Sequence, residues 1–165
     1  MVKIKKVPQQ GLRIQATMET PHRTAIAANG KALKLDMLEM LGGTHKGIMP
    51  LEALLAAYAG SLNVVGNFVA KTMDFDLHGL EFTIWAEFDP SGIWGLKKVR
   101  KPILATHVEA RVTTPESPKR VKDLHKRTTE RDPMHTLLKG AGVKIIEKWE
   151  RVPVGKSKSK GVTLF

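Results

Sequence analysis

One stretch constrains the fold of this chain more than any other, because it predicts a long and almost uncharged helix from Pro50 to near Met73. Proline is tolerated in the first turn of a helix, and Glu52 suits the positive end of the helix dipole there. Apolar residues then recur at helical spacing, at Leu54, Leu55, Tyr58, Leu62, Val65 and Val69. A helix this apolar is predicted to be central and mostly buried.

Alternating apolar and polar residues on both sides of this helix predict β-strands. Before the helix, strands are predicted at residues 2–7, 11–18, 23–28 and 34–38, with a hairpin signal at Asn29-Gly30. After the helix, the pattern predicts strands at 79–88, 103–113 and 143–152. Between the last two strands it predicts a basic helix from about residue 115 to Arg131 and then a short helical turn at 134–139. Strands segregated from helices favour an α+β domain over a doubly wound sheet. We expect one domain over residues 1–153 and a basic, disordered tail over residues 154–165.

The absence of cysteine from all 165 residues limits the chemistry that this chain can perform. It excludes a disulfide, a thiolate nucleophile and a metal site with cysteine ligands. The charged start of the chain lacks the apolar run of a signal peptide. The longest apolar stretch is interrupted by Glu52, Ser61, Asn63 and Asn67, which argues against a membrane span. We therefore expect a soluble, cytoplasmic protein with no membrane partner.

The formal net charge of +11 is compatible with an acidic partner such as nucleic acid. The basic residues are spread along the chain, with clusters at residues 97–101, 119–122 and 156–160. A solvated basic surface with a basic tail is the more favoured interpretation, and a polyanion-binding protein is the alternative.

Two segments resemble the OsmC/Ohr family of osmotically inducible and organic hydroperoxide resistance proteins. The first is residues 43–61, in which the glycine-rich loop Gly43-Thr44-His45-Lys46-Gly47 and Pro50 lead into the apolar helix as far as Ala59-Gly60-Ser61. The second is Glu130-Arg131-Asp132-Pro133-Met134-His135-Thr136-Leu137. Residues 77–81 and 89–92 are also typical of that family, and the resemblance extends from about Gly11 to Val152.

The resemblance implies antiparallel sheets around a long buried central helix, in an intertwined homodimer. In that family one cysteine in the central helix attacks a hydroperoxide, and a second cysteine before a proline resolves the sulfenic acid as a disulfide. The matching positions in this sequence are Ser61 and Asp132. Because neither residue is a thiol, hydroperoxide reduction by cysteine is not expected.

Other site positions implied by the resemblance also depart from the family pattern. In the family, a glutamate follows the proline, but Leu51 occupies that position here. The next residue, Glu52, is rotated by about 100° around the helix axis from Leu51, so its side chain points in another direction. The family arginine lies in the first strands, where Arg13 and Arg23 are both candidates.

A serine, an aspartate and a histidine also raise the alternative of a hydrolase, with Ser61 as nucleophile, Asp132 as orienting carboxylate and His45 or His135 as base. No Gly-x-Ser-x-Gly motif surrounds Ser61. A structural role is favoured, with Ser61 bonded to the carbonyl four residues earlier in its helix and Asp132 capping the turn that follows Pro133.

No metal or other cofactor is predicted. The six histidines show no ligand-like spacing, and Gly42-Gly43 lacks the rest of a phosphate-binding loop. The sequence thus favours a family member without thiol chemistry that is non-catalytic or binds a small hydrophobic ligand at the dimer pocket. A role in the hydroperoxide stress response by other means is a further alternative.

Overall fold

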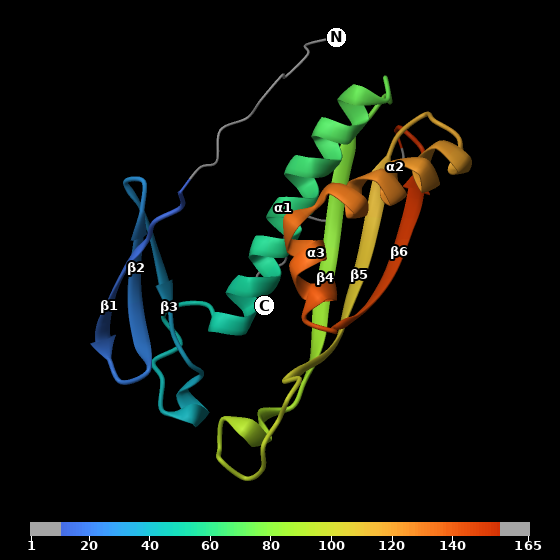
Figure 1. Cartoon of the computed structure of the whole chain (residues 1–165). Helices are drawn as coiled ribbons and strands as arrows, with labels where there is room; N and C mark the ends of the chain where they lie inside the picture. Colours follow the sequence, from blue (N-terminus) through green and yellow to red (C-terminus); the bar gives the residue numbers. More distant parts are fainter. Residues whose placement is uncertain (1–10, 156–165) are drawn as a thin grey trace. The chain divides into compact units, whose positions relative to one another are not determined.

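The structure, a computed structural model, describes residues 11–155 (Figure 1). The chain divides into two compact units, residues 1–54 and 55–165. The predicted strand at 2–7 and nearly all of the predicted basic tail lie outside the described residues. The expectation of a single domain over residues 1–153 therefore stays a prediction.

The first unit contains a three-stranded antiparallel sheet in the order β1 (Gln15–Thr20), β2 (Arg23–Ala28) and β3 (Lys31–Leu35), followed by the short 3-10 helix η1 (Glu39–Leu41). Asn29 and Gly30 form the predicted two-residue turn, with φ of 50° and 72°. This turn pairs Ala28 directly with Lys31. The third strand consequently begins three residues earlier than the sequence pattern predicts.

The second unit is built on a sheet in the order β4 (Gly79–Phe88), β5 (Ile103–Thr113) and β6 (Lys144–Val152). Strands β4 and β5 are antiparallel and coincide with their predicted bounds. Strand β6 pairs with β5 in parallel, so the expectation of purely antiparallel sheets is wrong for this unit. The reason is that α2 (Pro118–Arg131) and α3 (Pro133–Gly140) return the chain to the start of β5 before β6 begins.

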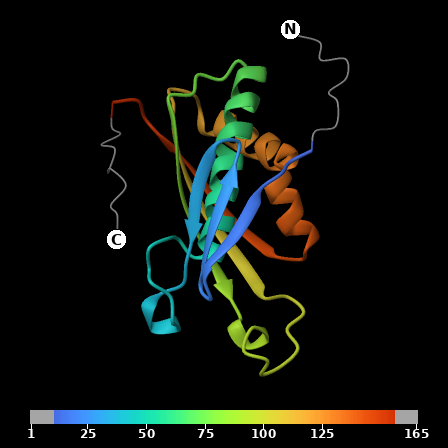
Figure 2. The same cartoon turned by 90° about the vertical axis from the view of Figure 1, so that its left-hand side faces the viewer.

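Helices cover one face of this sheet (Figure 2). Alternation along β4 places Leu80, Phe82 and Ile84 on the covered face. The core lies between α1 (Pro50–Thr72), α2 and the sheet. Its buried members are Val69, Ala70, Phe75, Val112, Val121 and Leu124. The predicted α+β class is therefore confirmed.

Helix α1 begins at Pro50 and ends at Thr72, as predicted, but only one of its faces is buried in the single chain. The buried residues are Tyr58, Leu62, Gly66, Val69 and Ala70. The expectation of a mostly buried helix is therefore not met by the single chain over residues 11–155.

By length and composition, α1 could also cross a membrane, contrary to the expectation from its interrupting polar residues. A single helix of this kind is weak evidence for a membrane protein, since the core helix of a soluble protein passes the same test.

Candidate functional site

Ser61 and Asp132 lie in direct contact in the second unit. The Ser61 hydroxyl donates a hydrogen bond of 2.7 Å to Oδ2 of Asp132, 71 residues later in the chain. Ser61 belongs to the middle of α1, whereas Asp132 separates α2 from α3. The expected bond from Ser61 to its own helix carbonyl is thus replaced by a tertiary bond. No space for a ligand remains between these two side chains.

Asp132 is fully buried and caps two helices, the C-terminus of α2 and the N-terminus of α3. Its backbone N–H donates to the carbonyl of Thr128 at the end of α2, at 2.9 Å. Its Oδ1 accepts the backbone N–H of His135 at 2.7 Å and caps the first turn of α3. The predicted capping role is confirmed, and both carboxylate oxygens of Asp132 have partners inside the chain.

Ser61, Asp132 and His135 are not arranged as a serine-hydrolase triad. Such a triad places an imidazole between the serine and the carboxylate. Here the serine contacts the carboxylate directly, and Nδ1 of His135 lies 2.9 Å from the hydroxyl of Tyr58. Ser61 therefore has no histidine base in this arrangement.

Tyr58 and His135 belong to a buried polar cluster that the sequence did not reveal. Glu147 on β6 lies between two histidines, with Oε1 at 3.8 Å from Nδ1 of His135 and Oε2 at 3.1 Å from Nε2 of His125. The ring of His125 is stacked on Trp149 at 4.9 Å between centroids. Burial, and then the charges of Glu147 and Asp132, raise the pKa of the Tyr58 hydroxyl far above its ordinary value.

Two signals in the sequence could have indicated this cluster. Tyr58 is the single tyrosine of the chain and lies in an otherwise aliphatic stripe of α1. Glu147 lies two positions from Ile145 and two from Trp149 along β6, so the three side chains share the covered face of this strand. A buried hydroxyl and a buried carboxylate both require polar partners.

A hollow of about 540 Å³ opens beside His125, His135 and Glu147. Its walls are formed by α2, α3 and β6, and its lining also includes Val143, Ile145 and the lysines Lys122, Lys126 and Lys139. The hollow thus connects the buried cluster with the basic outer side of α2 and α3.

In the first unit, Asp36 organises the glycine-rich loop that precedes α1. Its carboxylate is buried and accepts hydrogen bonds from the backbone N–H groups of Met37, Thr44 and Lys46 and from the Thr44 hydroxyl. The Thr44 hydroxyl is the main reason why the pKa of Asp36 lies far below its usual range.

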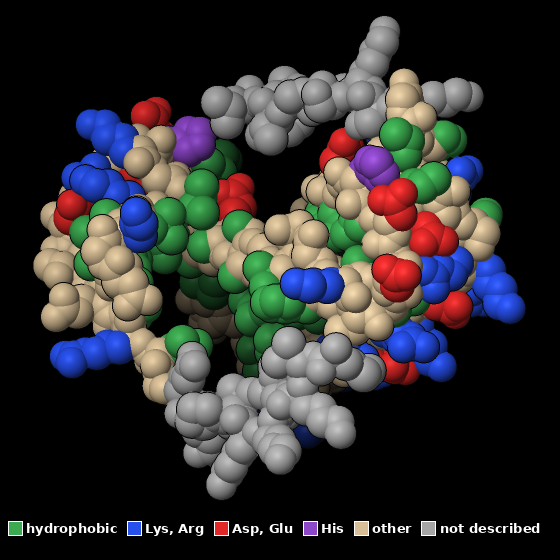
Figure 3. Space-filling model, turned by 90° about the horizontal axis from the view of Figure 1, so that it is seen from above, with side chains coloured by type: hydrophobic (Ala, Val, Ile, Leu, Met, Phe, Trp, Pro, Cys, Tyr) green, Lys and Arg blue, Asp and Glu red, His purple; other side chains and the backbone are tan. Residues whose placement is uncertain are grey.

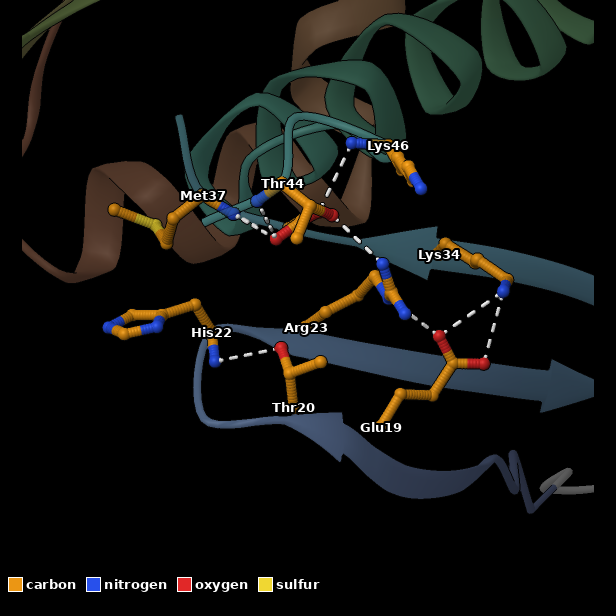
Figure 4. Close-up of polar contacts among 9 residues, drawn as sticks. Glu19, Thr20, His22, Arg23, Lys34, Met37, Thr44 and Lys46 are labelled. Carbon is orange, nitrogen blue, oxygen red and sulfur yellow. Dashed lines mark hydrogen bonds and ion pairs between the residues drawn. The ribbon is translucent and has the colours of Figure 1, made fainter. Parts of the chain in front are cut away.

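Arg23, one of the two arginine candidates, is tied to this loop. Its Nη1 donates to the Thr44 hydroxyl at 2.8 Å, and its Nε donates to Glu19 at 2.7 Å. Glu19 also pairs with Lys34 at 3.1 Å, as Figure 4 shows. Arg13, the other candidate, is exposed before β1. Of the two candidates, Arg23 is therefore the one whose guanidinium group is held by hydrogen bonds within the first unit.

The remaining predicted site residues also lie in the first unit. Glu52 accepts the backbone N–H of Met49 at 2.8 Å and so helps to start α1. Leu51 is partly exposed at the same helix end. His45 is exposed, with a φ of 51° and its backbone N–H bonded to the carbonyl of Met37. These residues are placed within their unit, and their roles stay predictions.

No three histidine, aspartate or glutamate side chains within residues 11–155 are arranged to hold a metal ion. Basic side chains are exposed along α2, at Lys119, Lys122, Lys126, Arg127 and Arg131. Acidic residues interrupt this series, and Lys126 lies 4.0 Å from Glu130. Figure 3 shows Lys and Arg side chains interspersed with acidic ones on the right of the view, where α2 and its sheet lie.

Residues 43–148 match the family model described as OsmC-like protein. The solved structures that resemble this chain include an OsmC like protein from Mycoplasma pneumoniae, with a TM-score of 0.76, 18% identity, and coverage of 88% of this chain and 99% of that chain. An organic hydroperoxide resistance protein OsmC from Legionella pneumophila has a TM-score of 0.68 and 17% identity, covering 87% and 99%.

An OsmC-like protein of unknown function from Vibrio cholerae has a TM-score of 0.69 and 9% identity, covering 86% of this chain and 100% of that chain. At these identities the likeness shows the fold alone. No curated protein matches the sequence.

Proposed function

Because the chain belongs to the OsmC-like protein family but contains no cysteine, we propose that it acts as a binding protein and not as a thiol peroxidase. The observation that carries this proposal is the hydrogen bond between Ser61 and Asp132. A serine hydroxyl cannot cycle through a sulfenic acid and a disulfide. The buried carboxylate holds that hydroxyl in a structural bond, which leaves it without the base that a nucleophile needs.

The place proposed for a ligand is the exposed side of α1, next to Ser61. Ser61 is only half-buried, and a side chain added at Gly60 would meet nothing within 4 Å. Ala56 and Ala57 are exposed one turn earlier, and Val64 and Phe68 follow along the helix. This surface carries no charge and is mostly apolar, with Asn63 and Asn67 as its exposed polar residues, so it suits a small hydrophobic molecule or an apolar protein surface.

A second copy of the chain is proposed to complete this site. Between Glu52 and Lys71 the helix contains no charged side chain, so two such helices can approach without leaving a charge buried. Small residues at Ala57 and Gly60 permit close contact between helix backbones. An apolar ligand enclosed between two copies would be shielded from water on every side.

Peroxide reduction tests the loss of thiol chemistry. With cumene hydroperoxide as substrate and dithiothreitol as reductant, we expect the wild-type protein and Ser61→Ala to give the same background rate. A wild-type rate clearly above that of Ser61→Ala would overturn the proposal, since it would assign a chemical role to the Ser61 hydroxyl.

Ligand binding is tested separately with lauric acid and with cumene hydroperoxide, using native mass spectrometry. We expect a bound molecule on the wild-type protein and a loss of at least tenfold in occupancy for Gly60→Leu, which fills the open surface. The matched control is Gly140→Leu, where the added side chain also meets nothing within 4 Å. Equal occupancy in all three proteins, or none in any, would contradict the proposed site.

Polyanion binding is the second candidate function, supported by the exposed basic residues of α2. It predicts affinity for a short DNA duplex that falls steeply with salt, because phosphate neutralisation releases counterions. Binding that does not change with salt, or no binding at low salt, would exclude it. A role in hydroperoxide stress by other means would appear as a peroxide-sensitive phenotype of a deletion strain despite the lack of turnover.

A further inference from the structure

The loop between β4 and β5 is an ordered projection and not a simple turn. Figure 1 shows that it extends beyond the ends of both strands, away from α2. Asp89 begins it, with its backbone N–H bonded to the carbonyl of Pro102 at 2.8 Å. Inside the loop, the 3-10 helix η2 (Pro90–Gly92) is capped by Asp89, and the Leu96 N–H donates to the carbonyl of Ser91 at 3.0 Å. These bonds give the loop a defined shape.

The tip of this loop exposes three large apolar side chains. Ile93 is 71% exposed, Trp94 60% and Leu96 77%. All three lie within four consecutive positions, whereas Val99 turns inward against Gly92. Apolar residues gathered in this way on an ordered loop mark an interaction site more often than single exposed residues do.

Basic residues follow the apolar tip at once. The segment Lys97-Lys98-Val99-Arg100-Lys101 carries four positive charges, all on exposed side chains. One of them is held in place, because Nζ of Lys97 lies 3.0 Å from Oδ2 of Asp89. The hydrogen bonds from Ser91, followed by that from Lys97, lower the pKa of Asp89 to about 2, so this anchor persists at neutral pH.

We propose that residues 89–102 form a docking tip for an anionic lipid surface. Trp, Ile and Leu side chains enter the boundary between headgroups and acyl chains, while adjacent lysines and arginines contact anionic headgroups. The tip offers both elements within one short loop. It is independent of the ligand site proposed on α1.

Other partners fit the tip less well. Nucleic acid would use the basic residues and Trp94, but Ile93 and Leu96 have no planar face on which a base can stack. A protein partner or a second copy would bury the apolar residues, but it would also need acidic groups opposite the basic segment. A lipid surface meets both requirements at once.

Vesicle flotation tests the proposal with the full chain. We expect binding to phosphatidylcholine vesicles that contain phosphatidylserine, and at least tenfold weaker binding to phosphatidylcholine alone. The variant Ile93→Ser/Trp94→Ser/Leu96→Ser should lose at least tenfold in affinity. The variant Lys98→Ala/Arg100→Ala should lose about fivefold for each charge removed. The matched charge control is Lys71→Ala/Lys144→Ala, at exposed lysines of α1 and β6 outside the loop, which should retain wild-type binding.

Quenching by brominated lipids gives a second measurement that does not depend on overall charge. We expect part of the tryptophan fluorescence to be quenched in the wild-type protein and this part to disappear in Trp94→Phe. Three outcomes would overturn the proposal: no binding to anionic vesicles, equal losses in the charged loop variant and in the Lys71→Ala/Lys144→Ala control, or apolar loop variants that change the oligomeric state without changing vesicle binding.

Discussion

Ser61 and Asp132 show how a hydrogen bond can join two residues that are far apart in the sequence. The positions that the family resemblance assigns to cysteines lie within hydrogen-bonding distance here, at 2.7 Å. A hydroxyl that donates to a carboxylate forms a charge-assisted hydrogen bond. The contact joins α1 to the α2–α3 junction, so we expect these two residues to contribute to stability.

Removing the Ser61 hydroxyl should therefore lower stability. In Ser61→Ala the buried Oδ2 of Asp132 loses its hydrogen-bond donor, and we expect a decrease of about 1–3 kcal/mol in the free energy of unfolding. Urea denaturation measures this value. Thr83→Ala is a suitable control, because its hydroxyl side chain is exposed on β4. An unchanged midpoint for Ser61→Ala would contradict the structural role.

Tyr58 provides a prediction on pH dependence, because it is the single tyrosine of the chain. Its folded-state pKa is raised, so its contribution to stability is complete below the unfolded pKa of about 10 and is lost as pH rises above that value. We expect no tyrosinate absorbance from the native protein at pH 10 to 11, and a steep increase only when the protein unfolds. Titration of the native state with a midpoint near 10 would show that Tyr58 is not buried as described.

At the residue scale, the sequence indicated Ser61, Asp132 and His135 but not their arrangement. The family resemblance indicated the positions Ser61 and Asp132, but no local pattern predicts a direct contact between residues 71 positions apart. Tyr58 and Glu147 were missed because both lie in apolar patterns. A periodicity argument assigns such positions to the core without asking for their polar partners.

Secondary-structure elements were predicted best where alternation is strict and least well where a turn sets the register. Strands β4 and β5 match their predicted bounds because long alternating segments have only one buried face. Strand β3 begins at Lys31 because the two-residue turn pairs the strands immediately. The parallel pairing of β6 depends on the path of α2 and α3, which no pattern within β6 encodes.

The loop before α1 depends on a glycine at one crowded position. A Cβ atom at Gly43 would lie 1.9 Å from the carbonyl oxygen of Met37, which real structures do not allow. We expect Gly43→Ala to destabilise the first unit by about 2 kcal/mol or more, because the backbone around Asp36 must shift. Gly11→Ala, where nothing lies within 4 Å, is the matched control. Hydrogen exchange of residues 36–46 measures the effect, and equal protection in both variants would contradict it.

For the whole molecule, the exposed face of α1 is the feature that a single chain leaves unexplained. Val64 is 52% exposed and Phe68 66%, on the longest helix of the described chain. On the opposite face of the same helix, Val69 and Ala70 are buried in the core. A helix that is apolar on both sides is normally buried on both sides. The second copy proposed above would supply the missing cover.

This homodimer leads to a prediction about the assembly. In Val64→Asp/Phe68→Asp, dimer formation would bury two uncompensated charges in each copy, which is strongly unfavourable. We expect the wild-type protein to show twice the chain mass by light scattering and the variant to show the mass of one chain. Far-UV circular dichroism should remain the same, since both side chains are exposed in the single chain.

The control for this experiment separates a specific interface from a general effect of added charge. Leu137 on α3 is 62% exposed, similar to Phe68, but belongs to another surface. Leu137→Asp should therefore remain dimeric. If Leu137→Asp also dissociates, or if the α1 variant keeps twice the chain mass, the two chains do not meet through α1. The ligand site proposed beside Ser61 would then have no second wall, and the exposed face of α1 would need a different partner.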